Sequence, residues 1–238
     1  MGLGSERKNQ KEIIKTFIRN NLPEMILSKK AEKIANAIND RTKLGDLRTI
    51  AKEIKKDHEL AKELWSTGKL FPRLLSVLIM DNKELHSDFI QTLFDDIENH
   101  ELEERMQLAD WLMANQLTKN KKAVALIASW ENSPSAIQRR IFWYHQGRLR
   151  WVGQTPPNNT EELLSAIEEK MLKEVPEVQW AMNFTAAWIG IFDQANRSQC
   201  IKMGEKLGLY KDEVVTKGCS PNYLPKFIEL EVQKRNLK

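Results

Sequence analysis

Hydrophobic side chains recur every three or four residues along most of this 238-residue chain, which is the spacing of one face of an α-helix. Residues 29–39 show the pattern clearly, because Ala31, Ile34, Ala35 and Ile38 fall on the same side. Almost no segment alternates with the two-residue period of a half-buried strand. The pattern therefore predicts an all-α protein with helices near residues 9–20, 29–39, 47–54, 58–66, 69–80, 85–97, 101–114, 119–130, 134–147, 160–173, 176–191, 197–208 and 225–235.

Short polar breaks join these amphipathic helices, and Asp46 is expected to cap the helix at 47–54. Helices that pack in pairs and stack on neighbouring pairs make HEAT-like or armadillo-type repeats. Helical pairs recur about every 35–45 residues, although without a repeated sequence signature. Periodicity alone therefore predicts either a HEAT-like/armadillo-type helical solenoid, an α-α superhelix, or a plain helical bundle.

Glycine and proline interrupt the helical pattern at two places. Residues 153–159 contain paired prolines and asparagines, which cannot continue a helix, and residues 209–224 form a second non-helical segment. We interpret residues 1–8 as a flexible leader. Residues 9–238 are predicted to form a single HEAT-like repeat domain, because each helix pair needs its neighbour to bury its second face.

Composition indicates a soluble globular protein, with 41% hydrophobic and 29% charged residues. No apolar run approaches the roughly 18–20 residues that cross a bilayer, so we expect no membrane association. The two cysteines, Cys200 and Cys219, are far apart, which favours a reducing cytoplasmic location. The four histidines show no metal-ligand spacing, and neither a Walker loop nor a GxGxxG fingerprint occurs. We therefore expect no metal and no small-molecule cofactor, and we expect a monomer.

Positive charge slightly exceeds negative charge, with a net charge of +4, which is compatible with a phosphate-binding surface. Basic residues gather near predicted helix starts, where free backbone N–H groups also favour anions. The alternative is an ordinary solvated surface of mixed charge. The basic clusters are Arg41, Lys43 and Arg48; Lys119, Lys121 and Lys122; and Arg139, Arg140, Arg148 and Arg150.

Three apolar helical segments each place a polar or charged group among large aromatic side chains: DWLMANQ (110–116), IQRRIFW (137–143) and VQWAMNF (178–184). Six of the seven tryptophans lie in or close to these segments. Aromatic residues at helical spacing usually pack in a core. A surface lined by several of them beside an arginine can instead hold an exposed base or a widened groove.

The order and spacing of these three segments resemble the active-site helices of the AlkD-type DNA alkylation repair family. Residues 46–68 resemble that family's early helices, which end in Leu-Trp, and residues 204–228 resemble its late region. The resemblance covers approximately residues 9–230. It implies HEAT-like repeats that bind duplex DNA on a basic concave surface, and an activity that excises N3- or N7-alkylated purines without flipping the base into a pocket.

The resemblance also assigns roles to residues. It implies that Trp111 and Phe184 contact the deoxyribose of the lesion, with Phe184 standing where tryptophan is usual, and that Arg139 holds a phosphate. Asn115 stands at the position of the family's catalytic aspartate. The further residues that we predict to contact DNA are Arg48, Arg140, Lys121 and Lys122.

Asn115 raises the question of catalysis, because an amide offers hydrogen bonds but no charge. A carboxylate about 4 Å from a unit positive charge contributes on the order of 4 kcal/mol at an effective dielectric near 20. Its loss from a transition state corresponds to roughly a thousandfold in rate. Asp110 is a weak candidate for a replacement acid, since five positions along a continuous helix turn it about 140° away.

Three hypotheses follow from the sequence. The first is a DNA-binding family member with a degenerate glycosylase site, which binds duplex, branched or alkylated DNA. The second is an active alkylpurine DNA glycosylase that uses Asp110 or a water positioned by Asn115. The third is a helical scaffold that binds other proteins.

Overall fold

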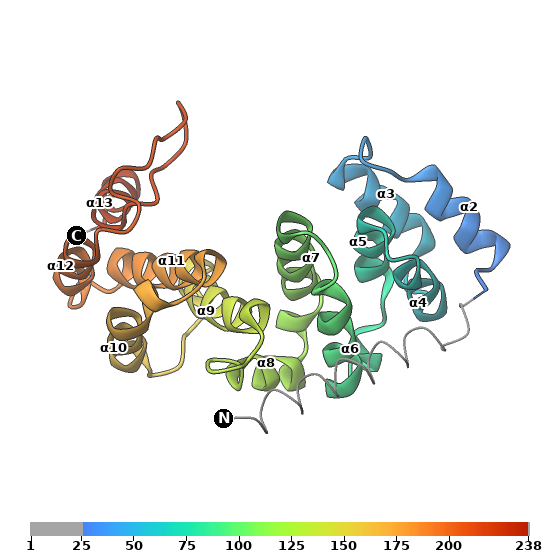
Figure 1. Cartoon of the computed structure of the whole chain (residues 1–238), viewed down its shortest axis with the longest axis horizontal. Coiled ribbons are helices and arrows are strands. Elements are labelled where there is room, and N and C mark those ends of the chain that lie inside the picture. Colours follow the sequence, from blue (N-terminus) through green and yellow to red (C-terminus); the bar gives the residue numbers. More distant parts are fainter. Residues whose placement is uncertain (1–25, 238) are drawn as a thin grey trace, which may run out of the picture. The chain divides into compact units, whose positions relative to one another are not determined.

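The computed structural model describes residues 26–237, and within that range it contains helices and no strand (Figure 1). The expected leader at 1–8 and the expected helix at 9–20 lie outside the described residues. Two compact units divide the chain after Ile79. The helices of the first unit are α2 (Lys29–Ala37), α3 (Leu44–Ile54), α4 (His58–Ser66) and α5 (Leu70–Ile79).

The second unit holds eight α-helices among its described residues, together with three short 3-10 turns. Its α-helices are α6 (Ser87–Ile97), α7 (Leu102–Asn115), α8 (Lys121–Ala128), α9 (Ala136–Trp151), α10 (Thr160–Lys170), α11 (Pro176–Phe192), α12 (Arg197–Leu207) and α13 (Leu224–Lys234). The 3-10 turns are η1 (Asn82–Glu84), η2 (Leu117–Lys119) and η3 (Met171–Lys173).

Polar side chains start several of these helices by accepting backbone N–H groups that have no partner within the helix. Asp57 accepts from Leu60 N at 3.1 Å, and Ser135 accepts from Gln138 N at 3.3 Å. The prediction that Asp46 caps its helix is wrong, because α3 begins two residues earlier. Asp46 lies in the first turn, and its carboxylate accepts from Lys43 N at 3.0 Å, which stabilises the same helix start.

Helix α11 is the centre of the second unit, and it packs against α9, α10, α12 and α13 (Figure 1). Its buried side includes Met182, Ala186 and Ile189, all fully buried. Helix α9 runs beside α11 over most of its length. Its C-terminal end is four residues beyond the predicted one at 147, because Arg150 and Trp151 still have packing partners there.

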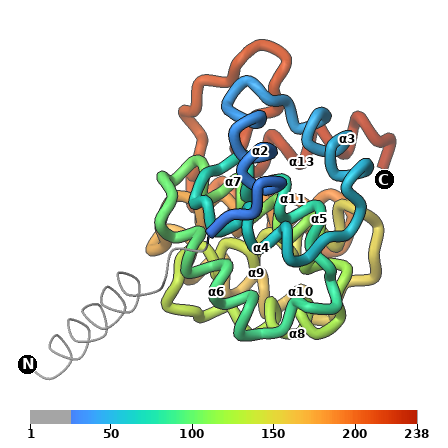
Figure 2. The backbone as a smooth tube through the Cα atoms, turned by 90° about the vertical axis from the view of Figure 1, so that its right-hand side faces the viewer, coloured from blue at the N-terminus to red at the C-terminus, as the bar shows by residue number. Residues whose placement is uncertain are grey.

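Most successive helices are joined by short connections, and two longer loops interrupt the second unit (Figure 2). Residues 152–159 join α9 to α10, where the sequence predicts a loop. Residues 208–223 join α12 to α13 and make the extended orange-red excursion in Figure 2. The first loop lines a pocket at the end of α9, and the second loop contacts α11 through a hydrogen bond from Asn183 to the Asn222 carbonyl.

Candidate nucleic-acid interface

Helix α7 carries the first of the three aromatic segments and ends at Asn115. The Asn115 side chain is half-buried, and its Nδ2 donates to the Trp111 carbonyl at 2.9 Å. Asn115 can therefore offer a ligand its amide oxygen as an acceptor and its second Nδ2–H as a donor, and neither group carries a net charge. Helix α7 is continuous from Asp110 to Asn115, so the two side chains leave it in different directions, as helix geometry predicts.

Asp110 is bound by a buried arginine of α9. Arg140 donates to both carboxylate oxygens, at 2.5 and 3.0 Å, and its side chain is 5% exposed. Burial raises the pKa of the Asp110 carboxyl above its ordinary value, while the charge and hydrogen bonds of Arg140 oppose that rise. The Asp110 carboxylate is thus engaged in an ion pair with Arg140.

Arg140 also joins the three aromatic segments. Its guanidinium carbon lies 5.1 Å from the Trp180 ring of α11 and 5.5 Å from the Tyr144 ring of α9, while its nitrogens hold Asp110 of α7. A guanidinium can stack on aromatic faces and pair with a carboxylate in its own plane at the same time. Arg140 was predicted to contact DNA, but it lies inside this junction and not on the surface.

The neighbouring Arg139 is held by Glu174, which lies between η3 and α11. Its Nε and Nη2 donate to the two Glu174 oxygens, each at 2.8 Å, and its Nη1 donates to the carbonyls of Ser133 and Pro134. These hydrogen bonds to Glu174 raise the pKa of the guanidinium above its ordinary value. Arg139 and Glu174 are each 18% exposed, so a phosphate would reach Arg139 by taking the place of Glu174.

Phe184 is part of an aromatic ridge, which we define as Trp180, Phe184, Trp188 and Phe192 on α11. These residues are four positions apart and follow one slowly turning side of the helix. Trp180 stacks on Phe184 with 5.3 Å between ring centroids, and Trp188 stacks on Phe192 with 5.6 Å. From α9, Tyr144 approaches Phe184 to 5.0 Å. The sequence assigns a DNA contact to Phe184 and places Trp180 and Trp188 in or near the aromatic segments, while Phe192 is the ridge residue that it does not indicate.

Gly147 lets this ridge pack against α9. A Cβ atom at position 147 would lie 2.6 Å from Cδ1 of Phe184 and 3.1 Å from the Thr185 Cα. The missing side chain is therefore what allows the Phe184 ring to lie against the α9 backbone. Gly147 escaped the sequence analysis because a glycine inside a helix has no sequence signature of close approach.

A basic cleft of about 360 Å³ lies at the start of α8. Its side chains come from η1, from His86 before α6, and from the segment that joins α7 to α8. None of the described residues that line it is acidic. They are Asn82, Lys83, Leu85, His86, Lys119, Asn120, Lys121 and Lys122.

Half-buried asparagine side chains fix the shape of this cleft. Asn82 Nδ2 donates to the Gln116 carbonyl at 2.8 Å, and Asn120 Nδ2 donates to the Asn82 carbonyl at 3.1 Å. The Asn120 Oδ1 accepts from the first backbone N–H groups of α8, which begins with the exposed Lys121 and Lys122. Lysines at a helix N-terminus favour phosphate through their own charge and through the positive end of the helix dipole.

The structure brings some predicted residues together and leaves others apart. Lys121 and Lys122 share the basic cleft with Lys83 and His86, which the sequence analysis did not single out. Arg48 is exposed on α3 of the first unit.

Within residues 26–237, no cluster of three or more histidine, cysteine or acidic side chains has the arrangement of a metal site. No helix in that range is long and apolar enough to cross a membrane.

Comparisons with known proteins agree on the family and the fold. A family model described as "DNA alkylation repair enzyme" matches residues 10–205. A solved structure described as "A new family of proteins related to the HEAT-like repeat DNA glycosylases with affinity for branched DNA structures" is similar over 94% of this chain and 95% of that chain, with a TM-score of 0.65 and 19% identity. No curated protein matches this chain. The predicted all-α, HEAT-like repeat fold is confirmed.

Proposed function

This chain belongs to the DNA alkylation repair enzyme family, and on that premise we propose that it binds duplex, branched or damaged DNA and excises bases weakly or not at all. The neutral side chain at position 115 carries this proposal. A glycosylase that expels a positively charged base needs an anion beside the sugar, and Asn115 cannot supply one. The nearby Asp110 carboxylate is already bound by Arg140.

The basic cleft supports the DNA-binding half of the proposal. Four lysines surround it, and two of them begin a helix, an arrangement that suits a phosphate whatever the base sequence. The similar solved structure is described as having affinity for branched DNA, so we extend the proposal to branched DNA for this chain. Arg139 is a further contact in this proposal, provided that phosphate replaces Glu174. Arg140 is left out, because its guanidinium is buried.

We predict that the combined Lys121→Ala and Lys122→Ala substitutions weaken binding to duplex and junction DNA to a similar extent. Each lost phosphate contact lowers the slope of log affinity against log salt by about one, so the double variant should lose about two. Fluorescence anisotropy titrations between low and moderate salt measure this slope. A matched control replaces the exposed Lys202 and Lys226 on α12 and α13 with alanine, and it should keep the wild-type slope.

The same samples test catalysis through release of methylated purine from methylated duplex DNA. Release close to the spontaneous rate is the expected result. Release far above that rate contradicts the noncatalytic half of the proposal and favours an active glycosylase, in which Asp110→Asn would then abolish release. Absence of DNA binding at low salt contradicts the DNA-binding half and favours a protein-binding scaffold. A monomeric state, a cytoplasmic location and the absence of a cofactor remain predictions.

A further inference from the structure

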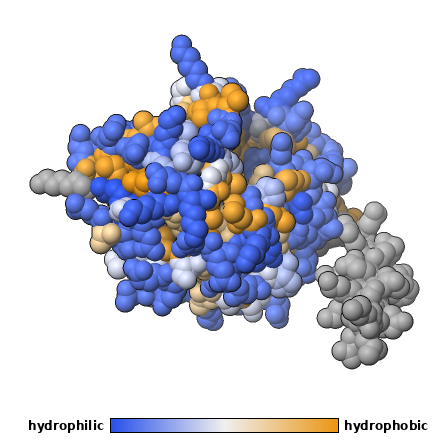
Figure 3. Space-filling model, turned by 60° about the vertical axis from the view of Figure 1, so that its left-hand side comes forward, coloured by the Kyte–Doolittle hydropathy of each residue, from blue (hydrophilic) through white to orange (hydrophobic). Residues whose placement is uncertain are grey.

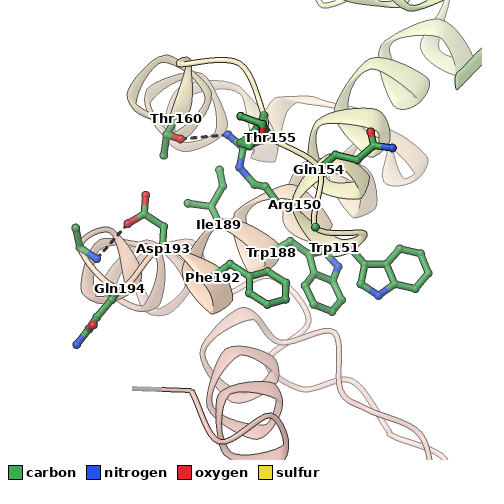
Figure 4. Close-up of a pocket in the computed structure, with 13 residues that line it drawn as sticks. Arg150, Trp151, Gln154, Thr155, Thr160, Trp188, Ile189, Phe192, Asp193 and Gln194 are labelled. Atoms are coloured by element: carbon green, nitrogen blue, oxygen red, sulfur yellow. Dashed lines mark hydrogen bonds between the residues drawn. The ribbon is translucent and has the colours of Figure 1, made fainter. Parts of the chain in front are cut away.

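A second concave site lies in the second unit, away from the basic cleft, where α9 and α11 end (Figure 4). We call it the aromatic pocket. It encloses about 970 Å³, within the range of small-molecule sites. The end of α9, the loop at 152–159, the start of α10 and the turn after α11 form its walls. The residues that carry the proposed function, Asn115, Lys121 and Lys122, lie outside this pocket.

One wall of the pocket is a stack of aromatic rings. Trp151 stacks on Trp188 with 5.8 Å between centroids and 25° between planes, and Trp188 stacks on Phe192 with 5.6 Å and 19°. The outer rings remain open to solvent, with Trp151 41% and Phe192 44% exposed. Figure 3 shows hydrophobic patches interrupting the hydrophilic surface on the side that it presents. Open aromatic faces of this kind offer stacking surface to another planar ring.

The opposite wall contains Arg150, a buried arginine whose hydrogen-bond partners are all neutral. Its side chain donates to the Gln146 carbonyl at 3.0 Å and to Thr160 Oγ1 at 3.1 Å, with a longer contact of 3.5 Å to Asn159 Oδ1. Among the described residues, no carboxylate lies within 4.0 Å of its guanidinium. Burial lowers the pKa of Arg150 below its ordinary value, and the charge of Asp193, farther away across the pocket, partly opposes that effect. Buried charges are ordinarily paired, so an anion in the pocket would complete this site.

Within the described part of the chain, the pocket also contains one hydrogen-bond donor without a partner, on Trp188, and one carboxylate, on Asp193. Trp188 is 4% exposed, and its indole N–H has no hydrogen-bond partner within residues 26–237; Figure 4 shows this nitrogen on the side that faces Trp151. Asp193 also lines the pocket, but its carboxylate accepts from Ala195 N, Asn196 N and Asn196 Nδ2 at 2.9–3.3 Å. The turn that leads into α12 therefore stabilises and holds the Asp193 carboxylate, which keeps its negative charge.

We propose that the aromatic pocket binds a nucleotide, with the planar base against the Trp151–Trp188–Phe192 stack and the phosphate beside Arg150. Gln154 and Gln194 stand at the rim of the pocket, and Figure 4 shows their side chains directed outward from the aromatic stack. The nucleotide comes either from an unpaired position in branched DNA or from a free mononucleotide. Binding of an unpaired nucleotide of branched DNA rests on the proposed function. Binding of a free mononucleotide does not depend on that function.

Fluorescence of 2-aminopurine tests this proposal, because the base loses emission when it stacks on an aromatic ring. One arm uses a three-way DNA junction with 2-aminopurine at an unpaired position, and the other arm uses 2-aminopurine deoxyriboside monophosphate. Stacking in the pocket predicts quenching by the wild-type chain. Trp151→Ala should remove most of the quenching and weaken binding of the quenched ligand about tenfold.

Arg150→Gln should weaken the same ligand by a similar factor, and circular dichroism checks that this buried substitution folds. Trp151 is exposed, so Trp151→Ala keeps the proposal testable if Arg150→Gln does not fold. The control is Leu172→Ala, which removes a 54% exposed apolar side chain elsewhere in the same unit and should leave quenching unchanged.

The two arms separate this inference from the proposed function. Quenching of the free nucleotide without DNA binding supports the pocket and contradicts DNA binding as the function. Junction binding without quenching in either arm overturns the pocket and leaves the function standing. Quenching that Trp151→Ala does not alter also overturns the pocket.

Discussion

At the scale of single residues, the chemistry of this chain depends on which charges are free to act. Asn115 is neutral, Asp110 is bound by Arg140, and Arg139 is bound by Glu174. Each of the two arginines therefore has a carboxylate partner inside the protein. DNA binding through Arg139 would exchange one ion pair for another, whereas exposed lysines such as Lys121 and Lys122 would gain a partner without losing one.

Asn115→Asp tests the importance of charge at this position. We predict that this substitution raises the release of methylated purine from methylated duplex DNA, by up to roughly a thousandfold if the new carboxylate reaches the sugar. The substitution lowers stability by about 1–2 kcal/mol, because the carboxylate faces the negative end of the α7 dipole and cannot donate the hydrogen bond that Asn115 makes to the Trp111 carbonyl. Base release and thermal unfolding measure the two effects.

A matched control for this variant is Asn132→Asp, which adds the same charge at an exposed loop position and should not change base release. Unchanged release in a folded, DNA-binding Asn115→Asp protein would show that this position does not limit catalysis.

At the scale of elements, the pairing of α9 with α11 forms both the Arg140 junction and the aromatic pocket. The two helices lie close because Gly147 leaves room for Phe184, and because rings from both helices interlock along the ridge. The junction lies toward the start of α9 and the pocket lies at its end. One packed helix pair therefore positions two chemically different sites.

Gly147→Ala should lower the free energy of unfolding by about 1–2 kcal/mol. Overpacking against Phe184 and the Thr185 backbone costs roughly 1–3 kcal/mol, and the better helix propensity of alanine returns up to about 1 kcal/mol. Denaturant unfolding measures the change. In Gly45→Ala, a Cβ would meet no atom within 4 Å, so this control should leave stability unchanged or slightly increased. Equal effects of the two substitutions would contradict a close approach at Gly147.

At the scale of the whole molecule, the predicted phosphate contacts are divided between two compact units. Arg48 belongs to the first unit, and Lys121 and Lys122 belong to the second. The prediction of a single repeat domain over residues 9–238 stays a prediction. So does binding along a continuous basic surface.

Salt dependence tests whether both units contact one DNA molecule. Arg48→Ala should lower the log–log salt slope by about one, and its combination with Lys121→Ala and Lys122→Ala should lower the slope by about three in total. Anisotropy titrations of the three variants supply the slopes. If Arg48→Ala leaves the slope unchanged, the first unit does not contribute this contact.

The amino-acid sequence by itself determined the helices, the all-α class and the family. Helical periodicity and polar capping residues are local, so the predicted helix positions agree with α2 to α13 within a few residues at most ends. The family resemblance rested on three short segments, and the match over residues 10–205 confirms it.

Only the tertiary structure decided the partners of each side chain. Periodicity shows which face of a helix is apolar, but it does not show which other helix covers that face. Arg139 and Arg140 are adjacent in sequence, yet one pairs with Glu174 and the other with Asp110, 35 and 30 residues away. The aromatic pocket likewise joins residues from α9, α10 and α11, whose proximity depends on packing between helices and has no local signature.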